Sequence, residues 1–232
     1  MDWQPVQKPA EMAESRLLEA ILSGYFPINS NLPGERELAS QIGVTRPTLR
    51  EALQRLARDG WLDIQHGKPT RVRDYWREGS LAVLSALARS PAHQSPDFIV
   101  HLLDLRMLIA PAYARQAVQA APGEIIALLE KYADLEDTPS AFARADWDLH
   151  SLLARHAANP VFQLLLNGFQ SLYLLVGDHY FASPECRQHS RGFYQSLLEC
   201  ACRGADCDAE SLTRHVMEES LALAKKMQKE NL

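Results

Sequence analysis

The sequence has little cysteine and no long apolar segment. Its four cysteines, Cys186, Cys200, Cys202 and Cys207, all lie in the last quarter of the 232 residues. A chain of this length can bury a core without disulfides, so we expect free thiols in a reducing compartment. No apolar run approaches the roughly 18 residues of a membrane span, and the first residues do not form a basic segment followed by an apolar one. These absences predict a cytoplasmic protein without a membrane partner.

Catalytic motifs are also missing. The sequence contains no glycine-rich phosphate loop and no Ser/His/Asp set in a context that supports catalysis, so we do not expect an enzyme. The composition, 47% hydrophobic and 23% charged, excludes a disordered or low-complexity chain. The length suits two domains of about 100 to 150 residues each.

The charge is unevenly distributed. The whole chain carries a net charge of −5, which would argue against nucleic acid if the charge were spread evenly. Residues 35–73, however, hold eight Lys and Arg against five acidic residues, a local excess of +3. The polar stretch 71–80 resembles a linker. We therefore predict two domains, residues 1–75 and residues 76–232.

The first domain has the pattern of a winged helix-turn-helix. Helical spacing covers three segments that Gly or Pro separates, namely 10–25, 35–42 and a helix that Thr45 can cap and that runs to Asp59. Two alternating segments, 61–65 and 70–73, then flank the turn HisGlyLysPro and predict a small β-hairpin wing.

The second domain shows helical spacing without any strand signal. The expected helices are 81–88, 97–119, 123–135, 140–158, 160–180, 184–203 and 206–229. The predicted fold is therefore mainly α, an N-terminal winged helix-turn-helix with a β-hairpin wing joined to a C-terminal all-α helical bundle.

Basic and hydroxyl side chains gather where a winged helix reads DNA. The N-terminal end of the third helix attracts phosphate through its backbone N–H groups, and arginine there can reach guanine O6 and N7. A narrow glycine-containing wing suits a minor groove. Helix-turn-helix spacing also occurs in three-helix packing without DNA, but the order of elements and the local charge together favour DNA binding.

Three segments, 32–39, 43–62 and 65–70, resemble the winged-helix domain of the GntR family of bacterial transcription regulators. Within that family the wing HisGlyLysProThr and the bundle segments 166–168, 171–173 and 179–185 are similar to the fatty-acid-responsive branch. The resemblance covers Pro9 to Lys229. It implies a homodimer that binds a palindromic double-stranded operator and releases it when long-chain acyl-CoA enters the helical domain.

The resemblance also implies site residues. The DNA contacts carried over position by position are Arg36, Thr45, Arg46, Thr48, Arg50, His66, Gly67 and Lys68. The effector contacts are Arg106, Ser220 and Lys229. Three positions depart from the fatty-acid-responsive pattern: Pro47 stands in place of a threonine, Met217 in place of a glycine and Ala224 in place of a tryptophan. The last two bear on which acyl chain fits.

A divalent metal is the alternative effector site. Many helical domains of this family bind one through an aspartate and three histidines. Asp146 and His150 share one helix face at i, i+4, and His215 falls near a later ligand position, although its spacing is one residue short. Such a set would suit a regulator that responds to a small carboxylate, or a metal-dependent helical enzyme. Alternatively, Asp146 and His150 form only a polar pair and His215 lies on the surface.

Overall fold

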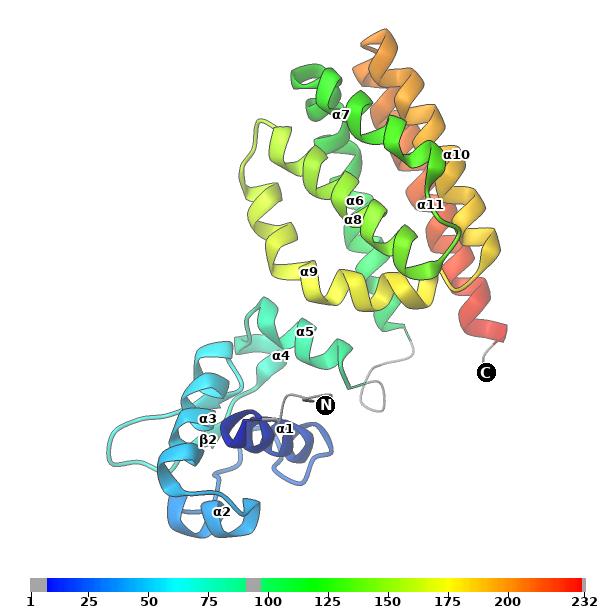
Figure 1. The fold of residues 1–232 in the computed structure, drawn as a ribbon. Helices are drawn as coiled ribbons and strands as arrows, with labels where there is room; N and C mark the ends of the chain where they lie inside the picture. Colours follow the sequence, from blue (N-terminus) through cyan, green and yellow to red (C-terminus); the bar gives the residue numbers. More distant parts are fainter. Residues whose placement is uncertain (1–7, 91–96, 231–232) are drawn as a thin grey trace, which may run out of the picture. The chain divides into compact units, whose positions relative to one another are not determined.

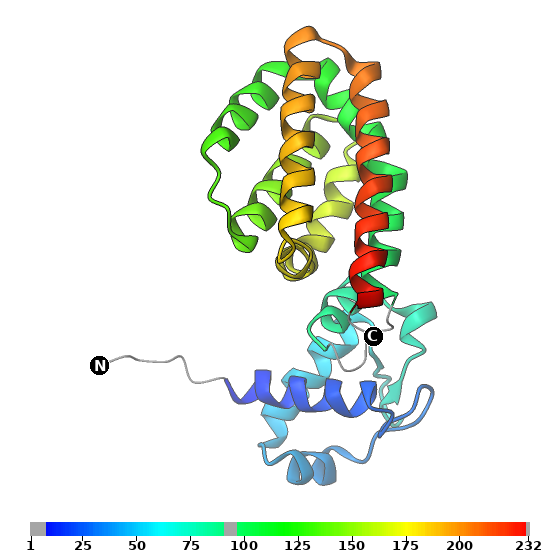
Figure 2. The same ribbon diagram turned by 90° about the vertical axis from the view of Figure 1, so that its right-hand side faces the viewer.

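The structure is a computed structural model that describes residues 8–90 and 97–230. The chain divides into two compact units, residues 1–93 and residues 94–232 (Figures 1 and 2). Together they confirm the predicted fold class, a winged helix-turn-helix followed by an all-α bundle. Among the helices of the described ranges, none has the length and apolar character that crossing a bilayer requires.

The first unit contains five helices and one small sheet among its described residues. Its elements are α1 (Pro9–Leu22), α2 (Glu35–Ile42), α3 (Arg46–Asp59), β1 (Leu62–Asp63), β2 (Arg71–Val72), α4 (Tyr75–Glu78) and α5 (Leu81–Ala88). The core of this unit forms where α1 packs on α3. Leu17 of α1 and Leu49 and Leu56 of α3 are buried there, each worth about 1.5–3 kcal/mol of stabilisation.

Local signals fix the ends of α2 and α3. Gly43 ends α2 with a left-handed φ of +80°, a conformation that costs glycine no steric penalty. Thr45 caps α3, because its Oγ1 accepts a hydrogen bond from the backbone N–H of Thr48. Gly60 ends α3 with φ of +98°. The helix predicted over 10–25 is wrong at its end, since α1 stops at Leu22 before a turn.

The wing is shorter than the sequence predicts. Strands β1 and β2 are two residues long each and pair antiparallel, with Leu62 opposite Val72. An isolated antiparallel bridge also joins Asn31 to Arg71 of β2. The stretch 71–80, expected to be a linker, contains α4, whose Tyr75 ring lies 4.7 Å from the ring of Trp61. Helix α5 contacts α3, so both α4 and α5 belong to the first unit.

All the regular secondary structure in the described residues of the second unit is helical. It comprises α6 (Phe98–Ala120), α7 (Pro122–Leu129), the 3-10 helix η2 (Glu130–Asp134), α8 (Pro139–His156), α9 (Val161–Tyr180), α10 (Pro184–Arg203) and α11 (Asp206–Glu230). Helix α6 packs along α11, α8 along α9, and α10 along α11. The predicted helix 123–135 is instead α7 followed by η2.

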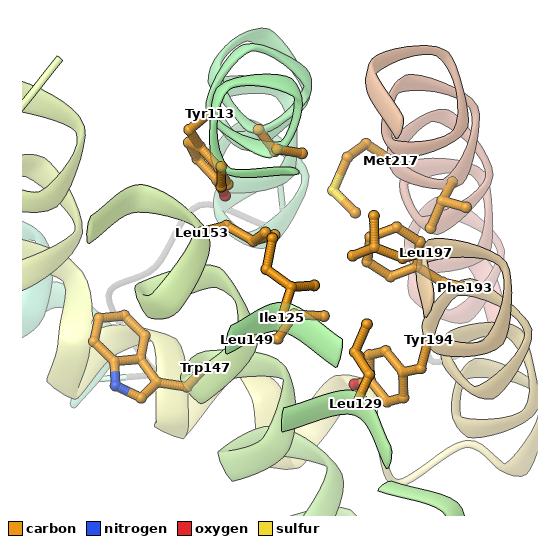
Figure 3. Close-up of a cluster of buried hydrophobic side chains, with 14 of the residues drawn as sticks. Tyr113, Ile125, Leu129, Trp147, Leu149, Leu153, Phe193, Tyr194, Leu197 and Met217 are labelled. Carbon is orange, nitrogen blue, oxygen red and sulfur yellow. The ribbon is translucent and has the colours of Figure 1, made fainter. Parts of the chain in front are cut away.

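The core of the second unit lies between α6, α7, α8, α10 and α11. Figure 3 shows Tyr113 of α6, Leu149 and Leu153 of α8, and Phe193 and Leu197 of α10 pointing toward one another. All five side chains are buried. This packing holds one face of α8 fixed, and the same helix carries Asp146 and His150.

Candidate functional sites

Two arginines lie one turn apart on the exposed face of α3. Arg46 and Arg50 are separated by four residues, so their side chains project from the same side of the helix. Their side chains are 57% and 59% exposed. Leu49 and Leu53, each three residues after one of these arginines, lie on the adjacent face and are buried against the rest of the unit. The fold therefore anchors α3 by its apolar face and leaves both guanidinium groups at the surface.

Side-chain hydrogen bonds hold the residues at the start of α3 in place. The Thr45 and Thr48 hydroxyls lie 2.8 Å apart and share a hydrogen bond. Pro47 occupies the first turn, where its missing N–H leaves no helical hydrogen bond unmade. Arg36, in the first turn of α2, is exposed. These groups place N–H and O–H donors and positive charge at the N-terminal ends of two neighbouring helices.

The tip of the wing is a tight turn. Gly67 has φ of +73°, and the backbone N–H of Lys68 donates to the Gln65 carbonyl over 3.2 Å. His66, Gly67 and Lys68 are all exposed. The side chain of Lys68 also reaches back to Gln65 Oε1 at 2.8 Å. The turn thus presents a narrow surface with one lysine charge.

A cavity opens between α6, α8 and α9 in the second unit. It contains about 800 Å³ not filled by protein atoms, part of it open to solvent. Apolar side chains form most of its wall, among them Leu102, Ile109, Leu166, Phe169, Leu172, Val176 and Phe181. Arg106, Tyr113, Asp146, Tyr173 and Tyr180 supply the polar atoms of the wall.

The polar atoms of the wall form a connected network around Asp146. Arg106 Nη2 donates to Asp146 Oδ2 at 2.8 Å, and the Tyr173 hydroxyl donates to the same oxygen. The Tyr194 hydroxyl donates to Asp146 Oδ1 at 3.2 Å. The guanidinium group of Arg106 also lies over the Tyr173 ring, 5.0 Å from its centroid. Both oxygens of this buried carboxylate therefore have partners.

His150 continues the network on the next turn of α8. Its Nδ1 shares a hydrogen bond of 2.7 Å with the Tyr113 hydroxyl, and its Nε2 lies 3.7 Å from Asp146 Oδ1. That distance is too long for a hydrogen bond, and Nε2 has no partner among the described residues. The ring packs nearly parallel to Phe193.

Burial and the Arg106 charge decide which groups are ionised. Burial alone would raise the pKa of Asp146, but the Arg106 guanidinium and the Tyr173 hydroxyl hold that pKa below its usual value. Burial, together with the nearby Arg106 charge, lowers the pKa of His150 to about 3, so its ring is neutral at pH 7. Burial also raises the pKa values of Tyr113 and Tyr173, which keep their protons. The network is thus an ion pair solvated by neutral hydroxyls.

The other two predicted effector residues lie on α11. Ser220 is buried near Tyr180, a residue of the cavity wall. Lys229 is exposed in the last turn of α11 and does not line the cavity. Met217 and Ala224 are buried in the core, and neither lines the cavity. The structure therefore brings Arg106 and the neighbourhood of Ser220 to the cavity, but not Lys229.

The predicted metal set is not assembled. Asp146 and His150 are buried on α8, whereas the His215 side chain is 68% exposed on α11 and pairs with Glu219. Across the described residues, no group of three or more His, Cys, Asp or Glu side chains could hold a metal ion. Asp146 already has a cation, Arg106, on one oxygen. The donors present thus do not fit a divalent metal, because the position beside the carboxylate holds a guanidinium group.

Sequence reasoning missed the tyrosines that complete this network. Tyr113, Tyr173 and Tyr194 come from α6, α9 and α10, and no spacing rule links them to Asp146. The available signal was physical: an aspartate on the apolar face of a helix requires hydrogen-bond donors from its neighbours.

The described geometry agrees with comparisons to known proteins. The family described as bacterial regulatory proteins, gntR family, matches residues 9–72, and the FadR C-terminal domain matches residues 73–231. The chain belongs to the FadR group of the GntR family. A fatty acid metabolism regulator protein of Erwinia tasmaniensis is 46% identical over 192 residues, covering 83% of this chain and 81% of that protein.

A second member of the FadR group gives fuller coverage. The fatty acid metabolism regulator protein of Klebsiella pneumoniae is 43% identical over 223 residues, which cover 96% of this chain and 93% of the relative. Among solved structures, Lar, which controls the expression of the Listeria monocytogenes agr system, is similar with a TM-score of 0.65. It is 20% identical and the match covers 96% of this chain and 99% of Lar, so it supports the fold alone. As a member of the FadR group, this chain is a DNA-binding transcription regulator.

Proposed function

We propose that this FadR-group regulator controls genes of fatty-acid metabolism, and that long-chain acyl-CoA releases it from operator DNA. It acts in the cytoplasm as a homodimer on a palindromic duplex, and it catalyses no reaction. The names of its relatives support the metabolic role. The observation that carries the effector is the apolar cavity between α6, α8 and α9.

The chemistry of the cavity favours an acyl chain with an uncharged head. Its wall is mostly leucine, isoleucine, valine and phenylalanine, which match a hydrocarbon chain. Arg106, in the wall, already pairs with Asp146, so a free carboxylate entering the cavity would compete for Arg106 and lose its hydration. A thioester avoids that cost because it carries no charge. The phosphates of CoA would remain in solvent outside the cavity.

Thermodynamic linkage between the two binding sites explains how acyl-CoA would release the DNA. If acyl-CoA and operator favour different arrangements of the dimer, each lowers the affinity of the other by the same factor. A coupling of about 1–3 kcal/mol corresponds to a reduction of roughly 5- to 150-fold in operator affinity.

The test is a titration with labelled DNA. The wild-type protein first selects a palindromic duplex from a random pool, and fluorescence anisotropy then measures its affinity with long-chain acyl-CoA, free fatty acid or CoA present. Only acyl-CoA should weaken binding. Val176→Trp, which fills the cavity, should remove the response, whereas Leu164→Trp on the exposed face of the same helix should keep it. Unchanged operator affinity at saturating acyl-CoA in the wild type would refute the proposed effector.

We propose the surface of α3, the first turn of α2 and the tip of the wing as the DNA contacts. Arg46 and Arg50 are the base readers, because arginine pairs bidentately with guanine in the major groove. Arg46→Ala should weaken operator binding by about 1–3 kcal/mol and affect a scrambled duplex less. Equal losses on both duplexes would mean that Arg46 contacts phosphate only. Sedimentation of the free protein at micromolar concentration tests the homodimer, and a monomer both with and without DNA would exclude it.

A further inference from the structure

One carboxylate contacts both proposed base readers. Glu35, the first residue of α2, accepts a hydrogen bond from Arg50 Nε at 2.7 Å through its Oε2. The same Oε2 lies 3.9 Å from Arg46 Nη2. The Glu35 side chain is 36% exposed, so the three groups form a small charged cluster at the surface between α2 and α3. An acidic side chain here is unexpected, because a DNA-binding surface faces phosphates.

We propose that Glu35 is a positioning residue that orients Arg50 toward a guanine and thereby increases the discrimination between operator and other DNA. The proposal rests on the role of Arg50 as a base reader in the function proposed above. It assigns to Glu35 an effect on sequence specificity and not on overall affinity.

The geometry of the guanidinium group supports this assignment. Arginine has five N–H donors in a fixed plane, one on Nε and four on the two terminal nitrogens. The bond from Nε to Glu35 uses the donor nearest the backbone and fixes the orientation of that plane. The two terminal nitrogens lie beyond it, farther from α3, where they can donate side by side to guanine O6 and N7.

The orientation of Arg50 matters because its side chain is largely exposed to solvent before it binds a base. The Arg50 side chain is 59% exposed, and a long exposed side chain loses rotamer freedom when it binds a base. A partner that already restricts the side chain reduces that loss for the correct contact. Contacts to phosphate gain little from such restriction, since a phosphate accepts a charge from many directions.

Electrostatic repulsion between the Glu35 carboxylate and the DNA phosphates would have the opposite effect on operator affinity. A carboxylate near the backbone of DNA weakens binding to every sequence, so its removal should strengthen binding to operator and scrambled duplexes alike. If Glu35 instead orients Arg50, removal of the Glu35 carboxylate should weaken binding to the operator and should leave binding to a scrambled duplex unchanged or stronger. The ratio of the two affinities therefore separates the explanations.

Three variants measure this ratio in the full-length protein. Glu35→Gln removes the charge and weakens the hydrogen bond, whereas Glu35→Asp keeps the charge but shortens the side chain by one methylene. Glu37→Gln is the matched control, because Glu37 is an exposed residue on the same helix whose side chain contacts Gln41. Thermal unfolding of each variant checks that the fold is intact.

We expect Glu35→Gln and Glu35→Asp to lower the operator-to-scrambled affinity ratio by roughly 3- to 5-fold, the size of an exposed ion pair. Glu37→Gln should leave the ratio unchanged. The effect of Glu35→Gln should disappear in an Arg50→Ala background, which a double-mutant cycle measures directly.

Other outcomes overturn the inference. If Glu35→Gln raises both affinities by the same factor, the carboxylate only repels DNA. If it raises operator affinity selectively, Glu35 holds the arginines away from the bases. In both cases a loss of operator binding by Arg50→Ala would leave the proposed DNA surface intact. If Arg50→Ala itself has no effect on operator affinity, Arg50 is not a reader, and the inference falls together with that part of the proposed function.

Discussion

Replacing Arg106 with Met should destabilise the second unit, and the loss should depend on pH. Met keeps much of the aliphatic volume, so the main change is removal of the cation that faces Asp146, a side chain only 5% exposed. Breaking one partner of a buried ion pair costs about 3–5 kcal/mol. Tyr173 and Tyr194 still donate to the carboxylate, so we expect the lower value, about 3 kcal/mol, at pH 8.

The loss should shrink as the pH falls. Without the Arg106 charge, burial raises the pKa of Asp146 above the value near 4 that an unfolded aspartate has. Between these two pKa values the folded variant binds a proton that the unfolded chain does not bind. Its stability relative to the wild type therefore increases by up to about 1.4 kcal/mol for each pH unit of acidification.

Urea unfolding at pH 8, 6.5 and 5, followed by far-UV circular dichroism and tryptophan fluorescence, measures this effect. Trp147 lies 5.2 Å from the Tyr173 ring and reports on the network. Adding Asp146→Asn to Arg106→Met should restore stability at pH 8 and remove most of the pH dependence. Arg115→Met is the control on the same helix, since the ion pairs of Arg115 lie at the surface, where solvent screening leaves them little effect on stability. Equal losses at pH 5 and pH 8, or a loss no larger than that of Arg115→Met, would refute the argument.

Three further predictions test other parts of the fold. Wild-type stability should fall by up to about 1.4 kcal/mol per pH unit from pH 6.5 toward 4, because the unfolded chain protonates His150 while the folded protein, whose His150 pKa is about 3, does not. His150→Phe should flatten this slope in urea titrations. An unchanged slope would assign the pH dependence to other groups. Gly60→Ala should destabilise the first unit by about 1–3 kcal/mol in thermal unfolding, since a Cβ there would lie 2.9 Å from Gly79 Cα. Gly43→Ala, at a residue with a similar φ but no atom within 4 Å of the added Cβ, should destabilise the unit less. Equal losses of stability would mean that only the backbone φ matters. A thiol reagent should modify Cys202 and Cys207 in the native protein and reach the buried Cys186 and Cys200 only on unfolding; rapid modification of all four would contradict that burial.

The sequence by itself determined the helices and the DNA-binding head. Most helix ends were predictable because they depend on residues within one turn, as with Thr45 capping α3 and Gly43 and Gly204 ending α2 and α10 in left-handed conformations. The basic excess of residues 35–73 could be counted directly. The 3.6-residue period also identified which faces are apolar, so the bundle followed without knowledge of its packing.

Only the tertiary structure decided what surrounds Asp146. Arg106, Tyr173 and Tyr194 lie 40, 27 and 48 residues away along the chain, and no local pattern relates them to Asp146. His215 illustrates the same limit. Its spacing from the expected ligand position was one residue short, and one residue turns a helix by about 100°. Val216 and Met217 consequently face the core, and His215 faces solvent.

Glu35 and Arg50 are a second case. They belong to different helices 15 residues apart, and the sequence predicted both helices but not the angle at which they meet. That angle depends on how α2 and α3 pack through buried residues such as Leu38, Leu49 and Leu53. Local rules therefore determined which residues are helical and which faces are apolar. Packing between distant segments decided which polar groups became partners, because side-chain contacts depend on the positions of whole helices.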